Sequence, residues 1–140
     1  MGKVAAQKYI VGLRKNIVND IPIVGKFGVR NEGSGDMYYK GANMIHTIRQ
    51  IINDDEKFRQ ILRGMNKDFY HQTVTTKQIE DYISAKAGMD FSTIFDQYLR
   101  TVKIPVLEYS QKKNYFRFRF PDTVPHLKLP MRFNETIVIS

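Results

Sequence analysis

The sequence predicts an α+β fold, with a predominantly α-helical bundle of about five helices followed by three or four short antiparallel β-strands. Two observations predict this class. Up to about residue 102, apolar residues recur every three or four positions, which is the period of amphipathic helices. After Lys103 the period becomes two, as in strands with one apolar face. We therefore expect a helical part over residues 1–102 and a strand-forming part over residues 103–140.

The first predicted helix covers residues 4–18 and ends before Pro22, because proline disfavours a helical conformation in the preceding residue. Residues 21–36 contain four glycines and a proline, which predicts a loop. A second helix is expected from about Met37 to Ile52, with Asp36 as its N-cap. Gly41 within this helix costs up to about 1 kcal/mol relative to alanine. We therefore expect another element to pack closely at that turn.

Three further helices follow with recognisable start signals. The acidic run ending at Glu56 predicts the cap of a third helix, and Thr75 with Gln78 forms a capping-box pattern for a fourth. Gly88 has the position of a C-terminal cap, and Asp90 is the expected cap of a fifth helix that runs to about Val102. The short connections between these helices predict antiparallel neighbours.

The strand-forming part begins with an expected edge strand at residues 104–109, where Pro105 is tolerated. A polar turn is expected at residues 111–114. Residues 115–120 then alternate, with the phenylalanines on one face and Tyr115 and the two arginines on the other. Two more apolar runs, at residues 127–133 and 136–139, predict the remaining strands. An apolar face of this size needs a cover, either from the helices or from further strands.

Composition excludes several classes of function. The absence of cysteine rules out disulfides, thiol catalysis and cysteine-based zinc sites. The net charge of +8 suggests a nucleic-acid or acidic partner, but residues 37–102 are nearly neutral, with nine Lys or Arg against eight Asp or Glu. A single-strand binding platform also needs aromatic and basic groups on one face. We expect no nucleic-acid partner. We also expect no membrane partner, since no apolar run approaches about 18 residues.

One segment contains side chains that could take part in catalysis. A glycine-rich stretch precedes a tyrosine and a lysine, which lie in the first turn of the second predicted helix. Further motifs follow in a defined order. The segments are Tyr38-Tyr39-Lys40-Gly41-Ala42, His46-Thr47-Ile48-Arg49, Phe58-Arg59-Gln60-Ile61-Leu62-Arg63, Thr75-Thr76-Lys77-Gln78 and Phe95-Asp96-Gln97-Tyr98-Leu99 with Ile104-Pro105. Their order and spacing resemble the M1 family of zinc aminopeptidases, the gluzincins.

The resemblance implies that residues 1–102 form the helical C-terminal part of a thermolysin-like peptidase domain. Residues 103–140 would begin a β-sandwich-like domain. It also implies a catalytic role for Tyr38, whose counterpart in the family hydrogen-bonds the oxyanion formed on the scissile carbonyl. A phenol is a neutral donor that stabilises developing negative charge. The Tyr-x-Lys-Gly spacing selects Tyr38 over Tyr39, and Lys40 is expected to have a structural role in the parent site.

The chain departs from the family in its zinc ligands. His-Glu-x-x-His and the Gly-x-Met-Glu-Asn substrate loop are both absent, and no two of His46, His71 and His126 are four residues apart. A catalytic zinc site usually has three protein ligands. We therefore expect a C-terminal fragment of a peptidase that removes N-terminal residues from peptides. Zinc and the peptide substrate would bind in the intact parent, while this chain alone would be inactive and hold no metal.

Other interpretations remain open at this stage. The chain could be a non-catalytic helical interaction module or a basic binding module. For the three histidines, packing or surface positions are expected, and for Asp54 to Glu56 a helix cap is expected rather than a cation site, which would need oxygens converging from a shaped loop. The partners expected for the fragment are the rest of the peptidase chain and, in the intact parent, the peptide substrate.

Overall fold

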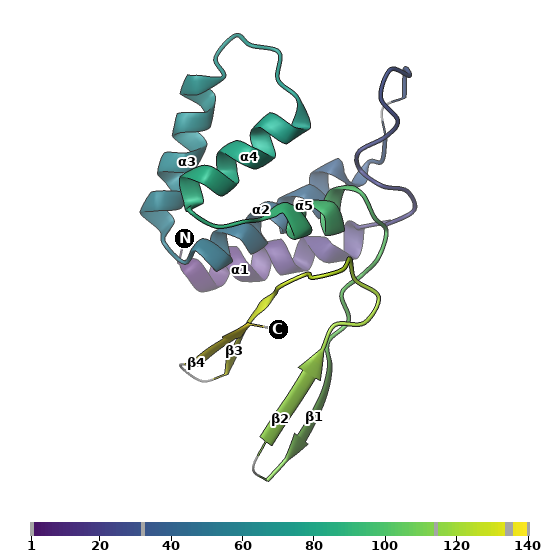
Figure 1. The fold of residues 1–140 in the computed structure, drawn as a ribbon, viewed down its shortest axis with the longest axis vertical. Coiled ribbons are helices and arrows are strands. Elements are labelled where there is room, and N and C mark those ends of the chain that lie inside the picture. Colours follow the sequence, from purple (N-terminus) through teal and green to yellow (C-terminus); the bar gives the residue numbers. More distant parts are fainter. Residues whose placement is uncertain (1, 32, 114, 134–135, 140) are drawn as a thin grey trace.

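The computed structural model describes residues 2–31, 33–113, 115–133 and 136–139. It has a helical body with two β-hairpins below it (Figure 1), so the predicted helix-dominated α+β class is confirmed. The helices are α1 (Lys3–Gly12), the 3₁₀ helix η1 (Leu13–Asn16), α2 (Asp36–Ile52), α3 (Asp55–Asp68), α4 (Thr76–Ala87) and α5 (Ser92–Leu99). The strands are β1 (Glu108–Lys112), β2 (Tyr115–Arg119), β3 (Pro130–Phe133) and β4 (Thr136–Ile139).

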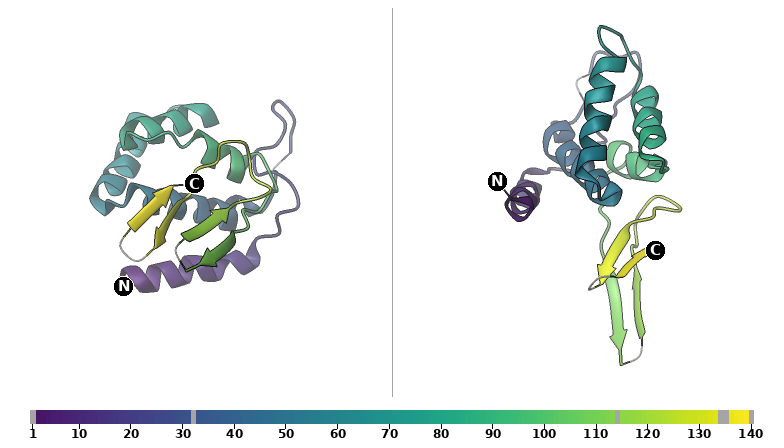
Figure 2. Two further views of the ribbon diagram at one scale, coloured as in Figure 1. Left: turned by 60° about the horizontal axis from the view of Figure 1, so that its bottom comes forward. Right: turned by 90° about the vertical axis from the view of Figure 1, so that its left-hand side faces the viewer.

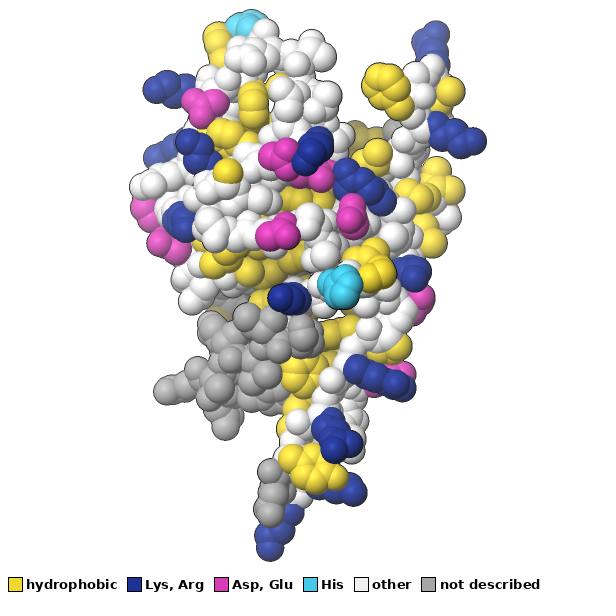
Figure 3. Space-filling view, in the orientation of Figure 1, with side chains coloured by type: hydrophobic (Ala, Val, Ile, Leu, Met, Phe, Trp, Pro, Cys, Tyr) yellow, Lys and Arg dark blue, Asp and Glu magenta, His cyan; other side chains and the backbone are white. Residues whose placement is uncertain are grey.

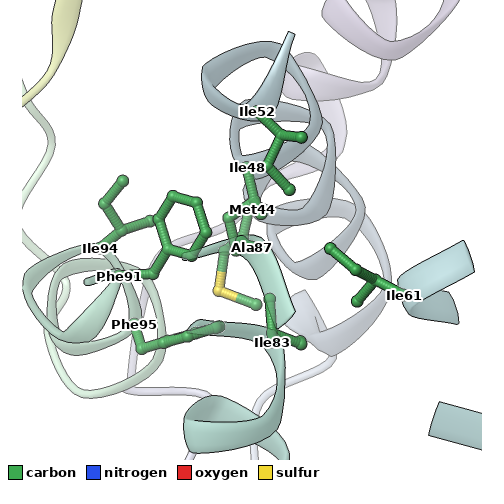
Figure 4. Close-up of a cluster of buried hydrophobic side chains, with 9 residues drawn as sticks. All are labelled: Met44, Ile48, Ile52, Ile61, Ile83, Ala87, Phe91, Ile94 and Phe95. Carbon is green, nitrogen blue, oxygen red and sulfur yellow. The ribbon is translucent and has the colours of Figure 1, made fainter. Parts of the chain in front are cut away.

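The hydrophobic core lies where α2 meets α3, α4 and α5 (Figure 4). The buried apolar side chains are Met44, Ile48, Ile52, Ile61, Ile83, Ala87, Phe91, Ile94 and Phe95. Those of α2 recur every four residues, so they form one row along the helix and face the same neighbours. Leu127 and Leu129, which precede β3, pack against this cluster and attach the strand-forming part to the helices.

Several predicted helix ends are confirmed. The Asp54 carboxylate accepts hydrogen bonds from the amides of Glu56 and Lys57, and α3 follows. Thr75 and Gln78 form the reciprocal capping box of α4, and Gly88 ends that helix at a φ of +67°. These caps were predictable because each depends on residues close together in the sequence.

Two helix starts differ from the prediction. Asp36 was expected as the N-cap of α2, but it lies within the first turn and Gly35 takes the cap position. The reason is that its carboxylate is bound by the loop before the helix, as described below. For α5, the Asp90 carboxylate accepts a hydrogen bond from the Ser92 amide, and the helix begins at Ser92 rather than directly after Asp90. The first helix is also shorter than expected, since α1 gives way to η1 at Leu13.

The close approach predicted at Gly41 is wrong, because a Cβ added there would meet no atom within 4 Å. The close approach occurs at Gly64 of α3 instead. There the hydroxyl of Tyr82, from α4, occupies the space that a Cβ would need. The same hydroxyl donates a hydrogen bond to Asp68 at 3.1 Å. Gly64 therefore allows α3 and α4 to pack as an antiparallel pair.

The strands form two antiparallel hairpins, β1 with β2 and β3 with β4. Pairing begins at Glu108 opposite Arg119, so the edge strand expected at residues 104–109 starts later than predicted. Gln111 and Lys112 were expected in a turn but extend β1, because they pair with Phe116 and Tyr115. The third strand is limited to Pro130–Phe133, and the expected fourth strand is present as Thr136–Ile139. Residues 114, 134 and 135 lie outside the described residues.

Candidate functional site

The first turn of α2 presents Tyr38 to solvent. Its side chain is 70% exposed, whereas that of Tyr39 is 38% exposed. Successive residues of an α-helix are rotated by about 100°, so Tyr38 points about 200° away from Asp36. Asp36 and Lys40, two residues to either side, are buried on the opposite face of the helix. Packing therefore does not account for the Tyr38 side chain, which is largely open to solvent.

Asp36 anchors this turn to the preceding loop. Asp36 is only 2% exposed. Its carboxylate accepts hydrogen bonds from the backbone amides of Val18 at 2.9 Å and Asn19 at 2.6 Å. The Asp36 amide donates to the Ser34 hydroxyl oxygen at 3.2 Å, and that hydroxyl donates to Asp20 at 3.2 Å. The buried carboxylate thus receives charge-assisted hydrogen bonds that balance part of its desolvation.

Lys40 forms the second anchor. It is 6% exposed, and its ammonium group donates to the side-chain oxygen of Asn19 and to the carbonyl of Thr101, both at 2.7 Å. Burial lowers the pKa of Lys40, and the nearby negative charge of Asp36 opposes that shift. Asn19 also donates from its side-chain amide to the carbonyl of Val102. Lys40 and Asn19 therefore join three segments that are distant in sequence, which agrees with a structural role for Lys40.

A third polar contact continues along α2. Asn43 is 4% exposed, accepts a hydrogen bond from Arg14 at 3.0 Å and donates to the carbonyl of Tyr39 at 2.9 Å. The buried contacts of Asp36, Asn19 and Asn43 were not predicted from the sequence. A signal was present, because Asp36 and Lys40 continue upstream the four-residue row that holds Met44 of the core. That spacing indicates burial for the two charged residues.

A groove of about 470 Å³ lies between α1 and α2. Its lining is Ala6, Tyr9, Ile10, Ala42, Ile45, His46, Arg49 and Phe58. The Nε2 atom of His46 is buried and, within the described part of the chain, has no hydrogen-bond partner. Burial lowers the pKa of His46, and the positive charges of Arg49 and Arg14 lower it further. The groove is therefore apolar with one unsatisfied polar atom.

The histidines do not form a metal site. His46 lies on α2, His71 follows α3 and His126 lies between β2 and β3. Among the residues that the structure describes, no group of three His, Asp or Glu side chains could hold a metal ion. Asp54 serves as a helix cap. Within this described part, the residues offer no ligand set for a catalytic zinc ion. The Tyr38 hydroxyl is a neutral hydrogen-bond donor.

The β1–β2 hairpin separates its aromatic and basic groups largely as predicted. Phe116 and Phe118 are half-buried on one face, whereas Arg117 and Arg119 are exposed on the other. Tyr115 shares the basic face, and the Arg117 guanidinium lies 5.2 Å from its ring centre. Figure 3 shows Lys and Arg side chains along this hairpin, while acidic and basic groups are mixed over the visible face of the helical body.

Comparisons of the chain with protein-family models, curated proteins and solved structures found no match. Within the described residues, no helix has the length and apolar character needed to cross a membrane. The site itself consists of an exposed phenol on a helix start whose backbone is fixed by Asp36 and Lys40.

Proposed function

We propose that this chain is the tyrosine-bearing helical part of a zinc-dependent aminopeptidase that removes N-terminal residues from peptides and resembles the M1 family. The observation that carries the proposal is the exposed Tyr38 hydroxyl on a turn anchored by buried Asp36 and Lys40. The anchors fix the backbone from which the Tyr38 side chain extends, and a donor that is preorganised needs little reorganisation when charge develops on its acceptor. The zinc ligands would come from polypeptide outside these residues.

The role proposed for Tyr38 is to donate a hydrogen bond to the carbonyl oxygen of the scissile peptide bond as that oxygen becomes negatively charged. The hydroxyl is a neutral donor, so it stabilises the developing charge without needing a counter-charge of its own. Such an interaction is stronger in the transition state than in the ground state, and it therefore increases kcat more than it affects KM. Lys40 would hold the turn in position from the buried side of α2.

The test uses the whole enzyme, in which these residues are joined to the zinc-binding part, and an aminoacyl p-nitroanilide as substrate. Tyr38→Phe should lower kcat by about 10²–10³, the usual loss for one oxyanion donor. KM should change little, and the zinc content should stay at the wild-type level because Tyr38 is not proposed as a ligand.

Tyr39→Phe is the matched control, since it removes the same atom from the adjacent residue and should be nearly neutral. A large loss of kcat in Tyr39→Phe would show that the catalytic role has been assigned to the wrong tyrosine. Wild-type turnover in Tyr38→Phe would refute the catalytic role and favour a non-catalytic helical interaction module instead.

A further inference from the structure

The β1–β2 hairpin extends away from the helical body (Figure 2). Among the described residues it forms a sheet of two strands, and all five residues of β1 are exposed. A two-stranded hairpin is only marginally stable by itself in water. Its outer edges also present backbone amides and carbonyls that no described strand pairs with. The hairpin therefore offers an edge at which an extended segment can add a third strand.

One face of the hairpin is basic. Directly opposed residues share a face, and the residues of this face are Glu108, Ser110 and Lys112 of β1 and Tyr115, Arg117 and Arg119 of β2. Arg119 is paired with Glu108 at 2.7 Å, yet its side chain remains 76% exposed. Within the described residues, neither Lys112 nor Arg117 has a carboxylate partner. Both cations lie over the Tyr115 ring, at 5.7 Å and 5.2 Å from its centre, and keep their charge.

The opposite face of the hairpin is aromatic. The rings of Tyr109 and Phe116 stack with their centres 5.6 Å apart, and the ring of Phe118 lies 6.1 Å from that of Phe116. Successive residues of β2 alternate between the two faces. A strand added along β2 therefore meets arginines with one set of its side chains and phenylalanines with the other.

Charge distinguishes the edge of β2 from that of β1. On the basic face, β1 contributes one acid and one base, so its charges cancel, whereas β2 contributes two arginines and no acid. Opposite charges on neighbouring strands attract, and apolar side chains pack against aromatic rings on the other face. The edge of β2 thus selects an extended segment in which acidic and apolar residues alternate.

Two other occupants fit this edge less well. Pairing of β2 with β2 of a second copy would place the arginines of both copies on one face, where like charges repel. Single-stranded nucleic acid needs aromatic rings free for base stacking beside the cations. Here the one aromatic ring on the basic face already lies beneath Lys112 and Arg117, and the phenylalanines lie on the other face.

We propose that the edge of β2 that faces away from β1 binds an extended acidic segment of a partner protein, in which acidic and apolar residues alternate. The segment adds a third strand by β-augmentation, so its backbone pairs with that of β2. Its acidic side chains lie beside Arg117 and Arg119, and its apolar side chains extend the aromatic row. This surface uses none of the residues around Tyr38 and does not depend on the catalytic role proposed there.

The first experiment measures binding of labelled peptides of about nine residues to the 140-residue chain by fluorescence anisotropy. One peptide alternates glutamate with valine, a second alternates lysine with valine, and a third has the glutamates and valines of the first in two separate blocks. The alternating glutamate peptide should bind at least about tenfold more tightly than either of the others. Equal binding of the glutamate and lysine peptides, or of the alternating and block peptides, would overturn the proposal.

Two substitutions make the same change of charge at exposed sites far apart in the fold. Arg117→Glu alters the basic face of β2, and Arg30→Glu alters the loop before α2. Arg117→Glu should weaken binding of the alternating glutamate peptide about tenfold or more and strengthen binding of the lysine peptide, because the attraction is reversed. Arg30→Glu should change either affinity by less than about twofold. Equal weakening by the two variants, or loss of both peptides in Arg117→Glu, would count against selection by the β2 arginines.

Hydrogen exchange in the wild-type chain locates the bound edge without any substitution. Saturation with the alternating glutamate peptide should slow exchange at the β2 amides that point away from β1, because these amides gain a strand partner. Slower exchange at the outward amides of β1 instead, or at no amide of the hairpin, would refute the proposal. Equally tight binding of an oligothymidylate of about 15 nucleotides would favour nucleic acid as the occupant. Self-association of the free chain with the same protection of β2 would show that a second copy occupies the edge.

Discussion

Asn19 shows how much of the candidate site depends on single side chains. Its amide donates to Asp36, its side-chain oxygen accepts from Lys40, and its side-chain nitrogen donates to the Val102 carbonyl. It also has a φ of +56°, a left-handed conformation that asparagine adopts more readily than most residues. Asn19 therefore adopts a left-handed backbone conformation and also makes three hydrogen bonds to other segments. The backbone that carries Tyr38 is held indirectly, through contacts on the opposite side of its helix.

His46 should make the stability of the protein sensitive to mild acid. Burial and two nearby arginines lower the pKa of His46 in the folded state, whereas the unfolded chain has the ordinary value of about 6.5. Below that pH the unfolded chain binds a proton that the folded chain resists, so acid favours unfolding. We expect His46→Gln to reduce the loss of melting temperature between about pH 7.5 and 5.5. Thermal melts followed by circular dichroism measure it.

His71→Gln is the control for this effect, because His71 is exposed after α3. It should leave the pH dependence of the melting temperature as in the wild type. If the His46→Gln and wild-type curves run parallel over the window, the folded and unfolded chains bind the same number of protons at His46. The interpretation of the groove histidine as a buried, neutral group would then be wrong.

At the scale of elements, the α3–α4 pair depends on Gly64. A Cβ at this position would overlap the Tyr82 hydroxyl, while the next ring carbon lies at 3.7 Å, an ordinary contact. Gly64→Ala should therefore destabilise the wild type by about 1–3 kcal/mol. In a Tyr82→Phe background the overlapping atom is gone, and alanine should then stabilise the helix by up to about 1 kcal/mol. Urea unfolding of the four variants measures this change of sign.

An equal change in the free energy of unfolding on Gly64→Ala in both backgrounds would contradict this prediction. Such additivity would mean that the hydroxyl and the added methyl group do not interact. Gly41→Ala provides a further comparison in α2, where nothing lies near the added atom. That substitution should be neutral or stabilising, in keeping with helix propensity alone.

Elements defined by local sequence were predictable, while those defined by distant contacts were not. The cap at Asp54 follows from residues two and three positions away. Asp36 has the same chemistry, but amides 17 and 18 residues away capture its carboxylate. In the same way, composition and spacing could not show that Gly64, rather than Gly41, has a close neighbour, because the neighbour is on another helix.

In the candidate site, too, the local features were predictable from the sequence and the distant contacts were not. The position of Tyr38 at a helix start was expected from the glycine-rich approach and the helical period. The anchoring of that start was not, because the partners of Lys40 are 21 and 61 residues away. The groove was also not predicted, because it depends on how α1 lies beside α2. Sequence periodicity indicates which face of a helix is apolar, but not which neighbour covers it.

At the scale of the whole molecule, Gln97 joins the helical part to the strand-forming part. It is 1% exposed on α5, donates to the Lys103 carbonyl at 2.7 Å and accepts from the Val124 amide at 2.8 Å. These two contacts hold the chain on both sides of the β1–β2 hairpin. Two hydrogen bonds from one buried amide therefore set where the hairpin leaves the helical body.

Gln97→Leu should loosen this junction. Leucine is similar in size but leaves the Val124 amide and the Lys103 carbonyl without their partner. A fully buried unsatisfied group costs about 1–3 kcal/mol, and these two groups are partly buried, so the cost of each is smaller. Hydrogen exchange should accelerate at the Val124 amide, while amides of the α3–α4 pair keep their protection relative to global stability. Gln60→Leu, on the exposed face of α3, is the matched control and should leave Val124 protected. Unchanged Val124 exchange in Gln97→Leu would show that Leu127 and Leu129, packed on the core, hold the two parts together by themselves.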